Sequence, residues 1–129
     1  MAKNNAVQHL QCDLASNNID IALIVETWFT LRIVDNAVAI RNYNLFRVDR
    51  TKHMGGGIAA YVREELHCKV IVPHTTAATL ELMWLQIEFH GLLMFVLCCY
   101  HPPKPYYAAA EMQNAITCDL DILLTRRRL

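Results

Sequence analysis

The stretch that most constrains this chain is residues 19–30, an apolar run that ends in a carboxylate. Its first six residues carry one charge, Asp20, and are rich in β-branched side chains, which is typical of a strand covered on both faces. Glu26 follows at the carboxyl end of this strand, where ligands of open α/β sheets usually bind. On this stretch alone a solvated glutamate is the better explanation, so a role for Glu26 depends on the rest of the chain.

Composition limits the possible classes of protein. A chain of 129 residues fits one domain or part of one, and a hydrophobic content of 54% excludes a disordered chain. Twelve Lys and Arg balance twelve Asp and Glu, so any binding of a polyanion would depend on local patches. Five cysteines without a C-x-x-C pair and six scattered histidines favour reduced thiols over a disulfide framework or a zinc site.

The sequence contains no convincing membrane segment. The longest uninterrupted apolar run covers residues 92–100, whereas a spanning helix needs roughly 20 residues. The N-terminal residues lead into no apolar signal segment. We therefore expect a protein that is not associated with membranes and is intracellular, either nuclear or cytoplasmic.

The spacing of apolar residues predicts two amphipathic helices with strands between them. The first helix has an apolar stripe at Val7, Leu10 and Leu14, and a surface loop is expected at residues 31–42. Strands are expected at residues 19–26, 43–48, 58–62, 68–72, 80–89 and 92–100. The last two form a predicted hairpin whose second strand is buried on both faces.

The second helix is predicted from Ala108 onward. Its apolar positions recur at helical spacing: Met112, Ile116, Leu120, Leu123 and Leu124. Glu111, Asp119 and Asp121 are expected on its solvent-facing side.

Three consecutive glycines, Gly55, Gly56 and Gly57, lead directly into the strand at residues 58–62. They are not a phosphate-binding P-loop, because the G-x-x-x-x-G-K-[ST] pattern is absent and a strand follows instead of a helix. Glycine allows close backbone approach or positive φ beside a site. A flexible hairpin connection explains these glycines almost as well.

Five segments occur in a recognisable order. They are a strand ending in Glu26-Thr27-Trp28, an Arg-x-Asp-Arg segment at residues 47–50, the glycine-led strand, a Leu-x-Trp-Leu-x-Ile strand at residues 82–87, and a strand ending in Tyr-x-Pro-Pro at residues 100–103. This order resembles the endonuclease/exonuclease/phosphatase family, and closely the endonuclease domain of non-LTR (LINE-type) retrotransposons. The matching segments run from about residue 7 to residue 124.

The resemblance implies an α/β fold, here a partial four-layer α/β sandwich with mixed, mostly antiparallel sheets and flanking helices. Members of the family hydrolyse phosphoesters with Mg²⁺ (or Mn²⁺) and no small-molecule cofactor, and the full-length retrotransposon enzymes act on DNA. By the same resemblance Glu26 is a catalytic metal ligand, and Tyr100 is a catalytic residue beside the scissile phosphate.

The chemistry of these residue types agrees with the implied roles. Magnesium prefers carboxylate oxygen and keeps several waters, so a single glutamate can anchor it. A phenol at Tyr100 can donate a hydrogen bond to a phosphate. Arg47, Arg50 and Lys52 are candidates for contacts with the DNA backbone, although an ordinary solvated loop explains these three cations equally well.

Several segments of the family do not occur in this sequence. They are an early Asn on the first strand, a Gly-Asp-x-Asn segment, a further Asp, and a closing Ser-Asp-His, which supply the general base and the acid–base pair. We therefore expect residues 1–129 to form an incomplete domain without the first strand and the C-terminal half. A site without its base loses nearly all of its rate, so we expect this polypeptide to be inactive or nearly so alone.

Three functional hypotheses follow. The first is a fragment of a metal-dependent endonuclease that nicks DNA as part of a retrotransposon reverse-transcriptase polyprotein. The second is a non-catalytic interaction module, or a mobile-element remnant, that pairs with a partner chain through its open sheet. The third is a phosphoesterase of the same fold that acts on another phosphoester, such as a lipid or a nucleotide.

Overall fold

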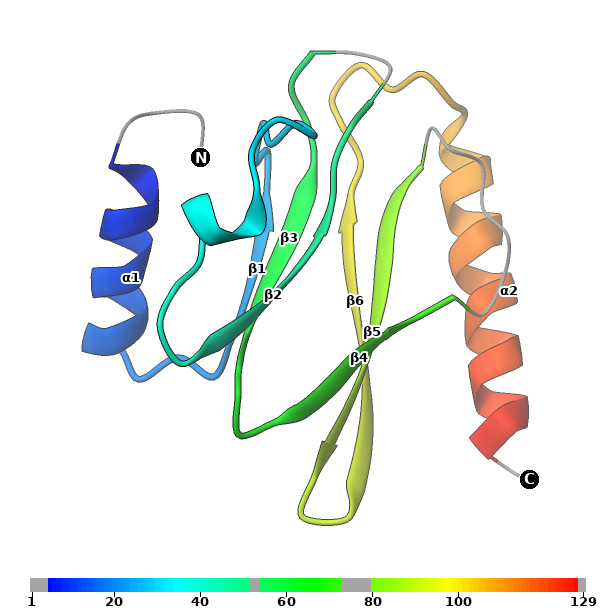
Figure 1. The fold of residues 1–129 in the computed structure, drawn as a ribbon. Helices are drawn as coiled ribbons and strands as arrows, with labels where there is room; N and C mark the ends of the chain where they lie inside the picture. The colour runs from blue at the N-terminus through cyan, green and yellow to red at the C-terminus, as the bar shows by residue number, and fades with distance from the viewer. Residues whose placement is uncertain (1–4, 52–53, 73–79, 128–129) are drawn as a thin grey trace.

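The computed structural model describes residues 5–51, 54–72 and 80–127, which form two α-helices flanking two antiparallel three-stranded sheets. Helix α1 (Ala6–Ser16) lies outside the first sheet, and helix α2 (Ala109–Arg127) lies outside the second. The order across the molecule is therefore helix, sheet, sheet, helix (Figure 1). A short 3₁₀ helix, η1 (Asp35–Ala37), lies in the predicted loop after the first strand.

The first sheet has the strand order β1-β3-β2 and the second β4-β5-β6. Their bounds are β1 (Ile21–Val25), β2 (Tyr43–Val48), β3 (Ile58–Arg63), β4 (His67–Ile71), β5 (Glu81–Phe89) and β6 (Leu92–Tyr100). All four strand pairings among the described residues are antiparallel. The predicted hairpin is β5 and β6, in which Glu81 pairs with Tyr100.

The core lies between the two sheets and beneath α1. Alternate residues of β3 face the second sheet, where they pack against the inward-facing residues of β5; the buried members are Ile58, Ala60, Val62, Met83, Leu85 and Ile87. The opposite face of β3 contributes Tyr61 to a cluster with Leu14 of α1. Because neighbours cover both its faces and both its edges, β3 is buried from Ile58 to Val62, and only its last residue, Arg63, is partly exposed.

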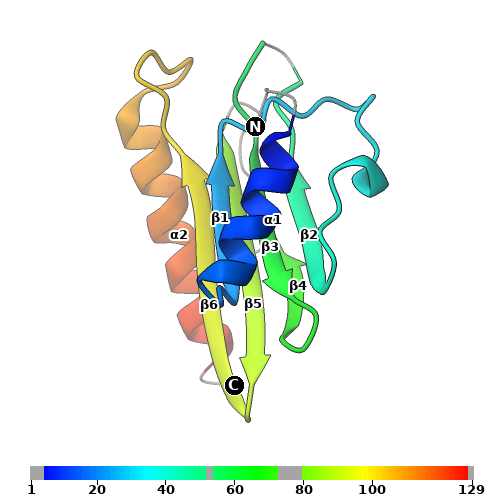
Figure 2. The ribbon, with the colours of Figure 1, turned by 90° about the vertical axis from the view of Figure 1, so that its left-hand side faces the viewer.

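Two predicted burial patterns were wrong. Strand β1 is not covered on both faces, since Leu23 and Val25 keep 42% and 43% of their surface exposed. Strand β6 is not buried on both faces either, because Leu92 and Met94 are exposed and only Cys98 is buried. Both are edge strands of the described sheets and lie on the same side of the molecule (Figure 2). The tip of the β5–β6 hairpin also extends beyond the first sheet (Figure 1).

The helix predictions were correct for α1 and partly wrong for α2. Leu14 is buried and Val7 and Leu10 are partly buried, as the stripe predicts. In α2, Met112 and Leu123 are buried and Leu120 and Leu124 are exposed. Asp119 is not on the solvent-facing side: it is 1% exposed, and its Oδ2 accepts a hydrogen bond of 2.9 Å from Nε1 of Trp84.

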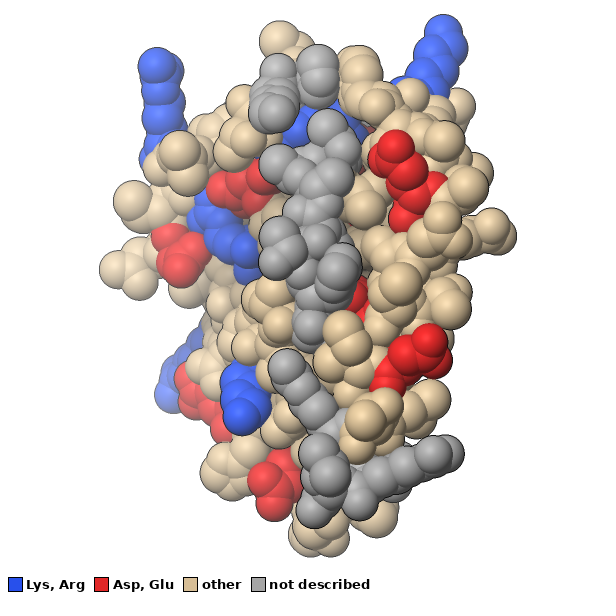
Figure 3. All heavy atoms as spheres, turned by 90° about the vertical axis from the view of Figure 1, so that its right-hand side faces the viewer, with Lys and Arg blue, Asp and Glu red and all other residues tan. Residues whose placement is uncertain are grey.

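The face covered by α2 carries interspersed acidic and basic side chains, and neither sign gathers over the described part of this surface (Figure 3). None of the described helices is both long and apolar enough to cross a membrane.

Candidate functional site

The ends of strands from both sheets meet at one end of the molecule. Glu26 follows the last residue of β1, and Tyr100 is the last residue of β6. Glu81 begins β5 opposite Tyr100, while the glycine segment leads into β3 beside the end of β1. The chain leaves β1 and β6 at the upper end in Figure 1.

Glu26 lies at the centre of this cluster and accepts hydrogen bonds from three groups. Nε1 of Trp28 lies 2.8 Å from its Oε2, the backbone N–H of Gly56 lies 3.3 Å from the same oxygen, and the Tyr100 hydroxyl also donates to the carboxylate. The Tyr100 bond, more than the Trp28 and Gly56 bonds, lowers the pKa of Glu26 below 4.5 and outweighs the effect of desolvation. Glu26 is therefore an ionised, partly exposed carboxylate at neutral pH.

The same contact acts on the phenol. The hydrogen bond to Glu26 raises the pKa of Tyr100 above its ordinary value of 10.0, and burial raises it further by a smaller amount. The hydroxyl therefore stays protonated at neutral pH and remains a hydrogen-bond donor. The structure thus brings together Glu26 and Tyr100, which lie in different sheets and were assigned from separate motifs.

We expect a Tyr100→Phe variant to raise the pKa of Glu26 toward 4.5, because the largest cause of its lowering is removed. A lowered folded-state pKa contributes stability above the unfolded value that is lost as pH falls through the folded value. The variant should therefore lose less stability than the wild type as the pH falls below 4.5. Carboxyl ¹³C NMR titration checks the pKa directly.

Tyr107→Phe is the matched control, since the Tyr107 hydroxyl donates to the backbone carbonyl of Tyr100 at 3.3 Å and is not among the groups that lower the pKa of Glu26. It should leave the pKa of Glu26 unchanged. An equal shift in both variants would show that the Tyr100 hydroxyl does not hold the carboxylate. Nδ1 of His101 lies 3.1 Å from the Tyr107 hydroxyl, so these side chains fix the segment that follows β6.

The backbone around Glu26 is unusual. Glu26 and Trp28 have φ values of 56° and 58°, and Gly55, Gly56 and Gly57 opposite them also have positive φ. The amides of Thr27 and Trp28 donate to the carbonyls of Gly57 and Gly56 at 3.3 and 2.8 Å, which holds the two segments together. Non-glycine residues in this region cost about 1–3 kcal/mol each and cluster at functional sites.

A Gly57→Ala variant should lose about 2 kcal/mol of unfolding free energy, because backbone strain adds to a steric clash. Gly57 has φ +86°, and a Cβ there would stand 2.5 Å from Oγ1 of the buried Thr27. Gly91→Ala is the matched control: its φ is +76°, but a Cβ would meet nothing within 4 Å. Urea denaturation of both variants separates the clash from the strain; equal losses would contradict the close approach at Gly57.

Arg50 and Glu81 form a second, more buried pair beneath the glycine segment. Nη2 of Arg50 lies 2.8 Å from Oε2 of Glu81, and the Gly57 N–H donates to Oε1 at 2.6 Å. The hydrogen bond to Glu81 is the main cause of a raised pKa at Arg50, to which the charges of Glu81 and Glu26 also contribute. Arg50 therefore lies within the electrostatic field of Glu26 and Tyr100 as a permanent cation.

Arg47 lies apart from this cluster, and its contacts are internal. Its five N–H groups all have acceptors: both carboxylate oxygens of Asp49, one oxygen of Asp35, and the carbonyls of Thr30 and Ile33. The guanidinium also lies over the Phe29 ring, 5.0 Å from its centroid. Arg47 thus fixes the loop after β1 and has no donor left over for a phosphate. Lys52 lies outside the described residues.

The cluster fits one mode of magnesium binding. No group of three or more His, Cys, Asp or Glu side chains among the described residues could hold a metal ion. Magnesium is often held by one or two carboxylates together with waters and substrate phosphate oxygens. The ionised, partly exposed Glu26 fits that arrangement as the protein ligand, whereas Glu81 is committed to Arg50 and Gly57.

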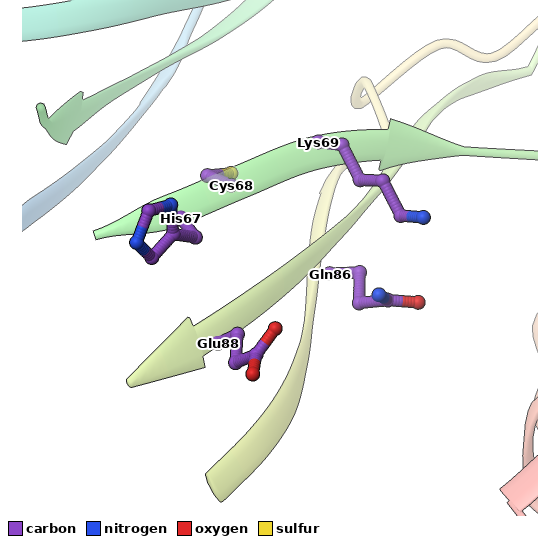
Figure 4. Close-up of a pocket in the computed structure, with 5 residues that line it drawn as sticks. All are labelled: His67, Cys68, Lys69, Gln86 and Glu88. Carbon is purple, nitrogen blue, oxygen red and sulfur yellow. The ribbon is translucent and has the colours of Figure 1, made fainter. Parts of the chain in front are cut away.

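Two surface hollows lie outside the Glu26 cluster. One, of about 260 Å³, is lined by His67, Cys68 and Lys69 of β4 and Gln86 and Glu88 of β5 (Figure 4). The other, of about 450 Å³, is bordered by residues of the loops after β1 and β2: Thr30, Leu31, Arg32, Asp49, Arg50 and Thr51. Only the second shares a residue, Arg50, with the cluster.

The sequence analysis missed two features of this site. Trp28 was noted as part of a motif but not as a partner of Glu26, and the pairing of Arg50 with Glu81 was not predicted. Glu81 nevertheless left a signal: it is an odd-numbered residue on a strand whose other polar residues, Gln86 and Glu88, are even-numbered. Alternation places it on the inner face, where a carboxylate needs a partner.

Comparison with protein-family models gives no match for this chain, and comparison with curated proteins gives none either. The functional assignment therefore depends on the geometry of the site, and the family resemblance remains a prediction.

Proposed function

We propose that Glu26 and Tyr100 form the metal- and phosphate-binding part of a metal-dependent phosphodiesterase site. The observation that carries this proposal is the hydrogen bond from Tyr100 to Glu26, which joins the ends of β1 and β6 across the two sheets. An ionised carboxylate next to a protonated phenol offers a ligand for a hard cation and a donor for a phosphate oxygen.

We further propose that the chain belongs to the endonuclease/exonuclease/phosphatase family, as an endonuclease domain of the non-LTR retrotransposon type. The sequence of layers, helix–sheet–sheet–helix, is compatible with part of a four-layer sandwich. The order of the motifs and the meeting of two of them at one site support the assignment. DNA is then the substrate, and a phosphoester of another kind is the alternative.

In this mechanism Glu26 would hold Mg²⁺, and the bound ion would neutralise charge on the phosphate and lower the pKa of a bound water. The one O–H of Tyr100, which donates to Glu26 in this structure, would turn to a phosphate oxygen once the ion takes its place on the carboxylate, and the cation of Arg50 adds a favourable potential. Trp28 and the Gly56 N–H keep the carboxylate oriented. The motifs that would supply a general base are not in this sequence, so we expect slow hydrolysis or none from this chain alone.

The test is Mn²⁺ binding measured by electron paramagnetic resonance, with Glu26→Gln as the variant. Glu88→Gln is the matched control, because Glu88 is an exposed glutamate of β5 that lines the hollow between β4 and β5, outside the Glu26 cluster. We expect Glu26→Gln to lose at least about tenfold in affinity, since the proposed charged ligand is removed, and Glu88→Gln to bind as the wild type. Equal affinity in all three proteins would refute the proposed metal site.

A plasmid-nicking assay with Mg²⁺ separates binding from catalysis. Nicking that Glu26→Gln abolishes would support the proposed function and contradict the expected low activity. Binding of Mn²⁺ without nicking is the result that we expect.

A second candidate function is a non-catalytic interaction module that pairs through an open sheet. The exposed apolar residues of two of the edge strands favour it: Leu23 and Val25 on β1, and Leu92 and Met94 on β6. Edge strands of this kind tend to pair with further strands. A discrete folded oligomer in size-exclusion chromatography, lost on Met94→Lys, would support this candidate; a folded monomer would count against it.

A further inference from the structure

The two tryptophans of the chain differ sharply in their surroundings. Trp84 is 5% exposed in the core beneath α2, whereas Trp28 keeps 44% of its surface exposed. Both indoles donate Nε1 to a carboxylate, Trp84 to Asp119 and Trp28 to Glu26. Trp28 is thus a large apolar side chain held at the edge of the candidate site, rather than part of a core.

Three features fix the Trp28 side chain in that exposed position. Its Nε1 is held by Glu26 at 2.8 Å, and its backbone N–H donates to the Gly56 carbonyl at 2.8 Å. The ring also lies so close to Gly55 that a Cβ there would stand 3.1 Å from Cζ2. An aromatic ring held in place in this way loses little conformational freedom when it binds a second ring.

The backbone at Trp28 is costly to maintain. A φ of 58° is a genuine outlier for a bulky residue, and such strain costs about 1–3 kcal/mol. This strain opposes folding, and a large part of the indole stays in contact with solvent. Strained positions of this kind concentrate at ligand-binding sites.

We propose that Trp28 is a stacking platform for an unpaired nucleobase next to the phosphate bound at Glu26 and Tyr100. The inference rests on the proposed function and narrows its substrate class to nucleic acid with an accessible base. An indole offers a flat π-surface, and every nucleobase has a matching one. The phosphoesters of saturated sugars or of lipids have no such planar group beside the phosphate.

The test is binding of two labelled oligomers in the presence of EDTA, which excludes metal and hydrolysis. One is a short single-stranded oligothymidylate, and the other is an abasic oligomer with the same number of phosphates. Fluorescence anisotropy gives both affinities for the wild type, Trp28→Leu and Trp28→Phe. In Trp28→Leu the remaining emission comes from Trp84, whose buried position makes it a reporter of the fold.

We expect Trp28→Leu to bind oligothymidylate about tenfold more weakly than the wild type, as is typical when one stacking ring is lost. Its affinity for the abasic oligomer should not change. Trp28→Phe should keep most of the preference for the oligomer with bases, because a phenyl ring still stacks although the bond to Glu26 is lost. This result would separate stacking from a role in orienting Glu26.

Three outcomes would overturn the stacking platform. The wild type could bind both oligomers equally or bind neither, or the Trp28→Leu variant could keep the preference for oligothymidylate. The third outcome is an equal loss of affinity for oligothymidylate in Trp28→Phe and Trp28→Leu. Glu26→Gln removes the proposed metal ligand but keeps the Trp28 ring, so it distinguishes the stacking platform from the metal site. A base preference that persists without any Mn²⁺ binding by the wild type would refute the metal site alone. Mn²⁺ binding without a base preference would refute the platform alone.

Discussion

An Arg50→Met variant should lose about 3 kcal/mol of unfolding free energy, the typical cost of removing one partner of a buried ion pair. Glu81 is 5% exposed, and its charge is balanced by the guanidinium at 2.8 Å. Without Arg50 the carboxylate keeps the hydrogen bond from the Gly57 N–H to its Oε1. Urea denaturation measures the loss.

Two further variants test this explanation. Adding Glu81→Leu to Arg50→Met should recover part of the loss, because no buried charge then remains unpaired. Asp20→Asn removes the ion pair between Arg63 and Asp20, in which the Asp20 side chain is 69% exposed, and should cost less than about 1 kcal/mol. Similar losses of unfolding free energy in Asp20→Asn and Arg50→Met would contradict the claim that burial of the ion pair determines the cost.

A Trp84→Phe variant should also lose about 3 kcal/mol, because a buried carboxylate loses its hydrogen-bond donor and a large ring leaves space behind. Asp119 is 1% exposed, and within the described part of the chain its Oδ1 has no partner. The Nε1 of Trp84 is therefore the donor that the described structure provides for this carboxylate.

Trp28→Phe is the matched control, since it removes an indole donor to a carboxylate that solvent reaches. We expect it to cost less than about 1 kcal/mol, because water replaces the lost bond to Glu26. Thermal or urea denaturation of the two variants gives the comparison. A loss at Trp28 as large as that at Trp84 would show that burial of the carboxylate does not determine the cost.

Local patterns were enough to predict the elements. Apolar spacing predicted both helices and the six strands to within a few residues, because each element covers one face of the core. Burial of the edge strands was predicted wrongly, since an apolar run such as β6 has the same composition whether it lies at the centre or at the edge of a sheet. Only the long-range pairing distinguishes the two positions.

Buried charges were the second source of error, although their positions are visible in the spacing. Asp119 lies three residues after Ile116 and four before Leu123, on the apolar stripe of α2. The role of Arg47 could not be predicted, because its acceptors at Thr30 and Ile33 lie in an irregular loop without a periodic signal. The Tyr100–Glu26 contact crosses the two sheets, and periodicity does not determine how sheets are aligned.

The strained segment around Glu26 connects stability to function. Glu26 and Trp28 adopt positive φ values at a cost that tertiary contacts with Gly56 and Gly57 offset. Pre-organised sites often carry such a cost. Substitutions that relieve the strain of their residues tend to increase stability and reduce function. The contacts of Gly56 and Gly57 therefore stabilise the fold and fix the geometry of the site at the same time.

The measurement that tests the account most directly is Mn²⁺-induced broadening of backbone amide signals in NMR spectra. We predict selective broadening around Glu26, Gly56 and Tyr100, and its loss in Glu26→Gln. Broadening centred on His67 and Glu88, or unchanged broadening in Glu26→Gln, would contradict a metal site formed by the ends of β1 and β6.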